Sequence, residues 1–406
     1  MVKKSDQSAY RTDTRLAHLG RDPMANHGVV NPPVYHASTI LADSLESYRG
    51  VRTDPFRKGH SSYGRQGTPT TFALEEAVAA LEGGYGAVAL PTGLAAIVVS
   101  ISSFVGQGDH ILVSDSVYQP NRRFCEDFLR RMGVETTFYD PCIGAGIAEL
   151  IGPETKLVFM ESPGSHTFEV QDVPAIAAAA RAAGVVSVMD NSWATPLYFR
   201  PMDHGVDVVA YAGTKYFVGH ADAMMGLVVT GEALYRQVRR TAAMLGHSAA
   251  PDDVYLTLRG LRTLSVRLAR HEETALTLAR WLQARPEVER VLHPALPEDP
   301  GHDIWRRDFS GSSGLFGMVL KPCPPEAVSA FADNLALFGI GASWGGYESL
   351  IAPSDIAAAR TATTWDEPGQ TLRLHAGLED PDDLIADLEA GFARMAAVVS
   401  GKRVTG

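Results

Sequence analysis

Short apolar runs alternate with helical segments between Thr68 and Thr230, and this alternation constrains the fold more than any other feature of the chain. The runs that read as strands include GAVALPTG, DHILVSD, KLVFMES, VVSVMD and VDVVAYAGTK, and helical patterns such as FALEEAVAALEGG and VPAIAAAARAAG lie between them. Strands that are apolar throughout belong to sheets that are covered on both faces. We therefore expect an α/β fold with a mostly parallel sheet, whose ligand lies beyond the carboxyl ends of the strands.

The chain of 406 residues divides into three parts. Residues 1–66 are rich in Pro, Gly, Ser and Arg and show little periodicity, so we interpret them as an extended arm that contacts a neighbouring subunit. Residues 67–261 carry the large sheet. Near Leu256 a long helical stretch begins, TLRGLRTLSVRLARHEETALTLARWLQAR, and we expect it to lead into a smaller C-terminal α/β domain at 262–406.

The composition argues against several classes of partner. A net charge of -11 without a basic patch does not favour nucleic acid or anionic membranes. The three cysteines are widely spaced and the histidines show no ligand spacing, so we expect no metal site and reduced thiols. No apolar stretch follows MVKKSDQSAY, which predicts a cytoplasmic protein without a signal peptide or a membrane span.

Lys215 and Asp190 both follow predicted strands. Lys215 comes after the small residues of YAGTK, and a buried lysine amine loses its charge and becomes a nucleophile. Asp190 ends VVSVMD, where a buried carboxylate needs a partner and could keep a pyridine nitrogen protonated. The plainer alternatives are a surface lysine at a turn and an aspartate that caps the next turn.

Several residues could bind an anion. The Gly turn in PTGLAAI opens a helix, so the backbone N–H groups of Gly93 and Leu94 are available to a phosphate. Thr214 could add a hydroxyl group, and Tyr63 and Arg65 of SSYGRQGTPT offer a phenol and a guanidinium. Each feature is weak alone, since many such turns bind nothing and both arm residues could be surface residues.

Tyr118 and Arg373 are the remaining candidates for a ligand site. Tyr118 follows a strand end in DSVYQP and could stack on an aromatic cofactor, although an isolated aromatic residue is more often part of the core. Arg373 lies within the strand TLRLHAG, and a buried arginine wants a carboxylate. That carboxylate could belong to an amino-acid substrate or to an internal ion pair.

The ordered motifs YGRQGTPT, ESPG, MDNSWATP, AGTKYFVGHADAMMG, SWGGYESL and RLHAGLED resemble the pyridoxal-phosphate enzymes of cysteine and methionine metabolism, from about Ser8 to about Met395. The resemblance implies the type I, aspartate aminotransferase-like fold and a homotetramer built from two dimers. It implies pyridoxal 5'-phosphate as the cofactor and a small sulfur-containing amino acid as the substrate.

The resemblance also implies roles for the candidates. Lys215 would form the Schiff base and move protons, Asp190 would bind the pyridine nitrogen and Tyr118 would stack on the ring. The phosphate would be held by Gly93, Leu94 and Thr214, and by Tyr63 and Arg65 in the neighbouring subunit's site. The substrate carboxylate would bind Arg373, and the pocket would be lined by Ser343 and Trp344.

Within the family, SWGGYESL resembles the beta-lyases, which implies beta-elimination of L-cystathionine to homocysteine, pyruvate and ammonia in methionine biosynthesis. Cystine and other cysteine conjugates would be further substrates. Ala212 and Ala243 depart from the pattern at the phosphate and at the distal substrate pocket, while Gln119 and Pro120 after Tyr118 disfavour a methionine gamma-lyase. A gamma-replacement synthase and a non-catalytic binding protein remain alternatives.

Overall fold

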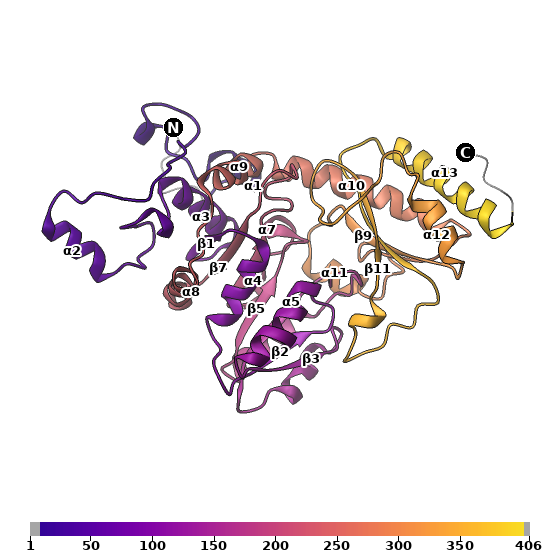
Figure 1. Cartoon of the computed structure of the whole chain (residues 1–406), viewed down its shortest axis with the longest axis horizontal. Coiled ribbons are helices and arrows are strands. Elements are labelled where there is room, and N and C mark those ends of the chain that lie inside the picture. Colours follow the sequence, from indigo (N-terminus) through magenta and orange to yellow (C-terminus); the bar gives the residue numbers. More distant parts are fainter. Residues whose placement is uncertain (1–8, 402–406) are drawn as a thin grey trace.

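The computed structural model describes residues 9–401, and a seven-stranded sheet forms its centre (Figure 1). The strand order is β1-β7-β6-β5-β4-β2-β3, with bounds β1 Gly86–Leu90, β2 His110–Ser114, β3 Glu135–Tyr139, β4 Thr155–Glu161, β5 Val186–Asp190, β6 Val208–Ala212 and β7 Gly226–Thr230. The five strands from β6 to β3 are parallel, and β7 runs antiparallel to both β6 and β1. The predicted α/β fold with a mostly parallel sheet is confirmed.

Both faces of this sheet are buried, as the apolar strands predict. Successive residues of β4 illustrate this, because Leu157 and Phe159 belong to one apolar cluster and Val158 and Met160 to another. The large domain contains α3 Pro69–Glu82, α4 Gly93–Ser102, α5 Gln119–Arg123, α6 Val173–Ala182, α7 Thr195–Tyr198, α8 Glu232–Met244 and α9 Pro251–Leu261. Helices such as α3 and α4 pack against this sheet, and the carboxyl ends of its five parallel strands lie at one edge, where α/β folds bind ligands.

The long helical stretch that the sequence predicts near Leu256 is two helices, α9 and α10 (Leu264–Gln283). At the break, the Arg262 guanidinium donates hydrogen bonds to the carbonyl oxygens of Leu16 (2.6 Å) and Leu19 (2.7 Å). These two carbonyls lie in the last turn of α1 (Thr12–His18) and at its C-cap, so Arg262 connects the start of α10 to the N-terminal segment.

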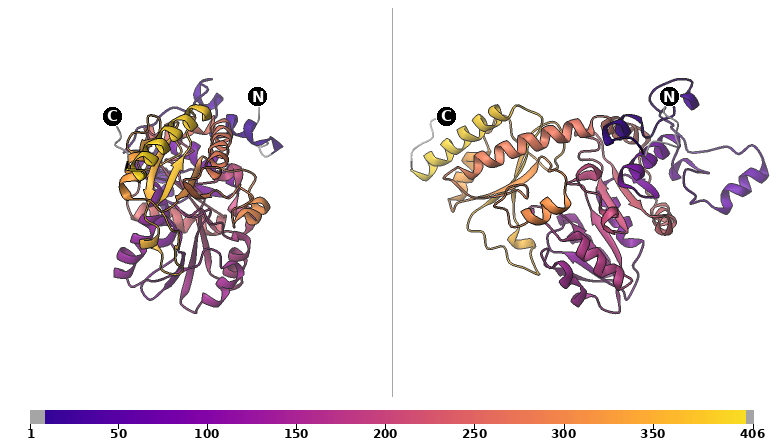
Figure 2. Two further views of the ribbon diagram at one scale, coloured as in Figure 1. Left: turned by 90° about the vertical axis from the view of Figure 1, so that its right-hand side faces the viewer. Right: turned by 180° about the vertical axis from the view of Figure 1, so that it is seen from behind.

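Helix α10 leads into a five-stranded sheet of order β10-β11-β12-β9-β8 (Figure 2). The strands are β8 Val288–Leu292, β9 Leu315–Leu320, β10 Gly339–Ile340, β11 Leu350–Ser354 and β12 Thr371–His375, antiparallel except for the β10–β11 pair. The helices of this part are α11 His302–Asp308, α12 Pro325–Ala332 and α13 Pro381–Val399. Apolar residues of α10, α12 and α13 pack against this sheet and form a hydrophobic core separate from those of the large sheet.

The N-terminal segment projects from the body of the molecule and carries α2 (Leu45–Thr53) far from both sheets (Figure 1). Its first eight residues, on which the prediction of a missing signal peptide rests, lie outside the described part of the chain. Within residues 9–401, no helix has the length and apolar character needed to cross a membrane. Shorter helical turns are η2 Met24–Asn26, η3 Gly64–Gln66, η4 Phe124–Leu129 (a π-helix), η5 Gly144–Leu150, η6 Pro201–His204 and η7 Ala357–Ala359.

Candidate active site

A cavity of about 290 Å³ lies at the carboxyl ends of the parallel strands, and residues of both sheet domains line it. Lys215, Asp190 and Tyr118 come from the large domain, and Trp344 and Arg373 come from the smaller one. Gly93, Leu94 and Thr214 line it as well, so eight residues that the sequence singles out as cofactor or substrate ligands meet in one place. This is the edge of the sheet at which α/β folds bind ligands.

Lys215 lies three residues beyond β6, and its side chain is directed into the cavity. The amine donates a hydrogen bond to the Ser343 hydroxyl (2.6 Å) and lies 5.3 Å from the centre of the Trp344 ring. Burial, helped by the charge of Arg373, lowers the pKa of Lys215 to about 8. The amine is thus held partly neutral near neutral pH, which is the state that a nucleophile or a proton acceptor needs.

Glycine is required beside this lysine. Gly345 has φ of 85°, and a Cβ at this position would come within 3.0 Å of the backbone of Lys215. Ser343, two residues earlier, also has a positive φ of 78°. The SWGG segment thus follows an unusual backbone path that brings Ser343 and Trp344 onto the lysine.

Asp190 is the last residue of β5, and its carboxylate is almost fully buried. Its Oδ1 accepts a hydrogen bond from the backbone N–H of Ser192 (2.9 Å). Burial raises the pKa of Asp190 despite the nearby charge of Lys215. A carboxylate in this state is stabilised by a ligand that brings a positive charge or an N–H group.

Glu161 was given no role from the sequence, yet it lines the same cavity. It pairs with Asp190 across β4 and β5, so the two side chains project from the same face of the sheet. Burial and the charge of Asp190 raise the pKa of Glu161 well above its usual value, and its Oε2 accepts a hydrogen bond from the Tyr118 backbone (2.7 Å). The sequence does not indicate that Glu161 lies beside Asp190, because this contact depends on how β4 and β5 pair.

The first turn of α4 forms the anion-binding end of the cavity. The Thr92 hydroxyl accepts a hydrogen bond from the Ala95 N–H (3.0 Å), while the N–H groups of Gly93 and Leu94 belong to the free first turn of a ten-residue helix. A Cβ on Gly93 would come within 2.6 Å of the Ala212 side chain, so glycine permits the close approach of α4 to β6. The Thr214 hydroxyl lines the cavity and exchanges hydrogen bonds with the backbone of Met225 (2.9 and 3.2 Å).

Arg373 lies in β12 with its side chain directed into the cavity. Its guanidinium donates long hydrogen bonds to the carbonyl oxygens of Gly341 (3.4 Å) and Ser343 (3.2 Å). Among the residues that the structure describes, no carboxylate lies at ion-pair distance from it. The internal ion pair that the sequence left open is therefore not found in this part of the chain, and a partly buried guanidinium without a carboxylate suits an anionic ligand.

Tyr63 and Arg65 do not line this cavity. Tyr63 is 48% exposed, and the Arg65 guanidinium donates a hydrogen bond to the carbonyl oxygen of Ala243 (2.7 Å) at the end of α8. Ala243, the departure expected at the distal substrate pocket, thus lies beside the arm residues rather than beside Lys215.

The comparisons with known proteins agree with this site. The model of the family described as Cys/Met metabolism PLP-dependent enzyme matches residues 13–393, and the chain belongs to this family. The chain is therefore an enzyme that uses pyridoxal phosphate.

Relatives within the family carry different names. The cystathionine beta-lyase of Escherichia coli strain K12 is 47% identical over 391 residues, which cover 95% of this chain and 99% of the relative. The L-alanine/L-glutamate racemase of Wolbachia pipientis is 40% identical over 395 residues, covering 95% and 98%. The crystal structure of a cystathionine gamma synthase from Xanthomonas oryzae, in complex with aminoacrylate and cysteine, has a TM-score of 0.87 at 33% identity and covers 96% of this chain and 99% of that one.

The cavity fits pyridoxal phosphate chemically. It offers an amine of lowered pKa for the aldehyde, a buried carboxylate for the pyridine nitrogen and a helix N-terminus for the phosphate. These three groups belong to Lys215, Asp190 and Gly93, and they line one cavity.

Proposed function

We propose that this enzyme is a carbon–sulfur lyase that cleaves L-cystathionine by beta-elimination to homocysteine, pyruvate and ammonia, as a step of methionine biosynthesis. Cystine and other cysteine S-conjugates present the same reacting part and are proposed as further substrates. The observation that carries the proposal is the cavity that unites Lys215, Asp190 and Arg373 in a chain that is 47% identical to a cystathionine beta-lyase.

Each cofactor contact is assigned to a side chain or backbone group of the cavity. Lys215 holds the aldehyde carbon, Asp190 the pyridine nitrogen and Tyr118 a face of the ring. The phosphate takes the N–H groups of Gly93 and Leu94, and the Thr214 hydroxyl. Bound there, pyridoxal phosphate supplies an electron sink for the carbanion at the substrate's alpha carbon.

The substrate is oriented by Arg373, whose guanidinium suits a bidentate contact with the alpha-carboxylate. Trp344 lines the same cavity, and Ser343, whose hydroxyl accepts a hydrogen bond from Lys215, is assigned to the substrate pocket with it. Lys215 Nζ then accepts the alpha proton, a role for which its lowered pKa of about 8 is suited. The same amine, now protonated, returns a proton to the departing sulfur atom.

Tyr63 and Arg65 are assigned to the site of a neighbouring subunit, and neither lines the cavity of its own chain. Residues 1–66 would form the arm that reaches the neighbour, residues 67–261 the cofactor domain and residues 262–406 the substrate-side domain. A site completed across an interface needs at least a dimer, and we propose a homotetramer of two dimers. We propose a cytoplasmic location, since the three widely spaced cysteines suit a reducing compartment.

Product analysis tests the reaction. Purified holoenzyme is incubated with L-cystathionine, and the thiol and the keto acid are identified. Equal amounts of homocysteine and pyruvate are expected. Cysteine with 2-oxobutyrate, or formation of a thioether from an activated homoserine, would indicate the gamma-lyase or gamma-synthase alternatives.

Because one of the relatives is named as a racemase of L-alanine and L-glutamate, the test must also include L-alanine. L-alanine has no leaving group, so a lyase leaves it chemically intact. Rapid formation of D-alanine together with no keto acid from L-cystathionine would contradict the proposed function.

A further inference from the structure

His166 lies in the loop that follows β4, and it lines the cavity together with Lys215 and Arg373. Hydrogen bonds hold this loop in place, from the Ser165 N–H to the Ser116 carbonyl (2.7 Å) and from the Phe168 N–H to the Gly164 carbonyl (3.0 Å). A histidine thus stands at a fixed position on the wall of the substrate site.

The backbone at His166 is left-handed, with φ of 66°. Such a conformation is unfavourable for an ordinary side chain and is found where the surroundings enforce it. Glycine or asparagine would adopt it more easily. A histidine therefore occupies this position although its backbone conformation favours glycine or asparagine.

One imidazole nitrogen is already engaged. His166 Nδ1 lies 2.7 Å from the hydroxyl of Ser354, which is itself 5% exposed. When this hydroxyl donates to Nδ1, the ring proton must be on Nε2, so Nε2 becomes a hydrogen-bond donor. Burial and the charge of Arg373 lower the pKa of His166 to about 4, which keeps the ring neutral at physiological pH.

The strand register brings Ser354 and Arg373 to the same side of the small sheet. Arg373 is paired with Ala352 in the β11–β12 ladder, and Ser354 lies two residues further along β11. Residues two apart on a strand project from the same face, so Arg373 and Ser354 are diagonal neighbours there. The imidazole bound to Ser354 is consequently held beside the guanidinium.

We propose that His166 is a further substrate-binding residue, whose Nε2–H donates a hydrogen bond to the alpha-carboxylate that Arg373 binds. The inference rests on the proposed function in one respect, that the cavity takes an amino acid. A guanidinium satisfies two lone pairs of a carboxylate in one plane, and a neutral imidazole adds a third donor without a second charge. Ser354 is then a positioning residue, because it acts through the histidine.

The test compares ligands with and without a carboxylate. The holoenzyme is titrated with L-alanine and with ethylamine, which is L-alanine without its carboxylate, and dissociation constants are read from the cofactor absorbance. His166→Asn keeps the preference for a left-handed backbone and an amide near the Nδ1 position, but it removes Nε2. His166→Gln is the matched control, because its amide reaches the Nε2 position.

His166→Asn is expected to raise the dissociation constant of L-alanine about tenfold, the size of one hydrogen bond to a charged group, and to leave that of ethylamine within about twofold. His166→Gln should recover most of the loss. Ser354→Ala, which leaves the histidine in place, should weaken L-alanine in the same direction by a smaller factor. Melting temperatures measured in parallel identify any variant that is misfolded, and Ser354→Ala then carries the test.

An unchanged dissociation constant for L-alanine, or an equal loss for both ligands, would overturn the proposal. Binding of L-alanine needs no elimination, so this result is independent of whether the wild-type enzyme releases pyruvate from L-cystathionine. Failure of the proposed reaction and failure of the role of His166 are thus separate outcomes.

Discussion

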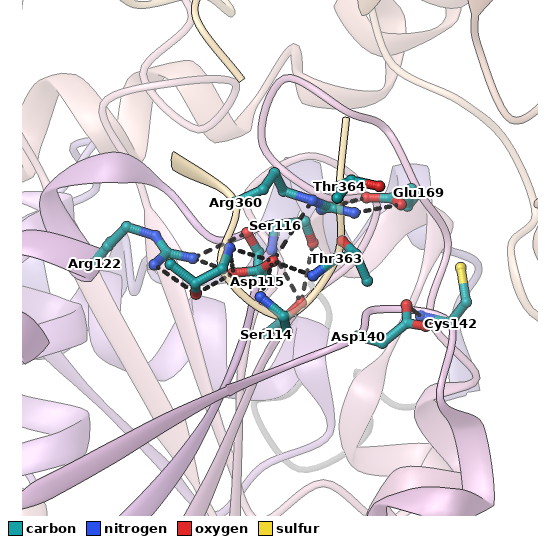
Figure 3. Close-up of polar contacts among 12 residues, drawn as sticks. Ser114, Asp115, Ser116, Arg122, Asp140, Cys142, Glu169, Arg360, Thr363 and Thr364 are labelled. Atoms are coloured by element: carbon teal, nitrogen blue, oxygen red, sulfur yellow. Dashed lines mark hydrogen bonds and ion pairs between the residues drawn. The ribbon is translucent and has the colours of Figure 1, made fainter. Parts of the chain in front are cut away.

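Two aspartates at the ends of strands of the same sheet have opposite surroundings. Asp115 follows β2, and its carboxylate accepts hydrogen bonds from the backbone N–H groups of residues 361–363 (2.9 to 3.2 Å). Arg122 and Arg360 lie on either side of it (Figure 3). Asp190 ends β5, and Ser192 is the only donor that the described residues bring to its carboxylate.

The pKa values record this difference. The three backbone N–H groups and Arg122 hold the pKa of Asp115 below its usual value, although burial opposes them. Burial raises the pKa of Asp190 because its partners are too few. A buried carboxylate that receives several hydrogen bonds from the protein holds two parts of the fold together. A buried carboxylate that receives few hydrogen bonds from the protein can accept them from a ligand.

Asp115→Asn is expected to lower the free energy of unfolding by about 3–5 kcal/mol, because it removes the buried carboxylate that pairs with the buried Arg122 guanidinium. The loss would be measured by urea unfolding of the holoenzyme. The control is Glu126→Gln, since Glu126 is the other partner of Arg122 and its side chain is 45% exposed. An exposed pair contributes at most about 1 kcal/mol. Equal losses in the two variants would contradict the comparison.

Asp190→Asn is expected to reduce turnover about 10- to 1,000-fold, because an amide no longer keeps the pyridine nitrogen protonated. This range corresponds to the effect of an opposite charge on a pKa, about 1–3 pH units. Pyruvate release from L-cystathionine would be measured at saturating substrate. A turnover within twofold of the wild type would show that Asp190 does not act on the cofactor.

The two aspartates should also give opposite pH dependences of stability. The folded pKa of Asp115 is lowered, so its stabilisation is present above about pH 4 and is lost as the pH falls through the folded pKa. The folded pKa of Asp190 is raised, so its contribution is present below about pH 4 and is lost as the pH rises through the folded pKa.

The opposite effects of the two aspartates on stability are best measured in the apoprotein, where the cofactor does not contribute to stability. At pH 7, apo Asp190→Asn should melt above the wild-type apoprotein, and apo Asp115→Asn should melt below it. The Asp190 difference should shrink as the pH falls toward about 4, whereas the Asp115 difference should shrink only below about pH 4. Melting curves at several pH values would measure them, and the same sign for both variants would contradict the assigned environments.

Glu161→Gln is expected to have the smallest effect, with turnover and melting temperature close to the wild type. The raised pKa favours the protonated form of Glu161, and glutamine resembles that form in shape and in accepting the Tyr118 N–H. A change of about 0.5 kcal/mol or less is expected. Glu161→Ala, which removes the acceptor, serves as the control and should have the larger effect.

The sequence predicts the strands and the chemistry at their ends because both are local signals. The apolar run before Asp190 and the small residues before Lys215 place these residues at the edge of the sheet without any knowledge of the tertiary fold. The assignment of Tyr63 and Arg65 to a neighbouring subunit's site came from the family resemblance and stays a prediction.

Contacts between distant segments carry no such signal. The bond between Asp115 and Thr361 joins residues 246 positions apart, and nothing in either segment indicates it. The ends of α9 and α10 depend on Arg262 reaching the N-terminal segment. His166 has no ligand spacing in the sequence, and only the cavity and Ser354 reveal its position.

Exchange of the alpha hydrogen of L-alanine with solvent tests the central claim most directly, because Lys215 is the proposed base and alanine has no leaving group. In deuterium oxide, the wild-type holoenzyme should replace the alpha hydrogen, followed by proton NMR, with retention of the L configuration. Lys215→Ala, reconstituted with pyridoxal phosphate, should lose at least about 100-fold in this rate, the usual contribution of a positioned base. Exchange by Lys215→Ala at the wild-type rate would contradict the account.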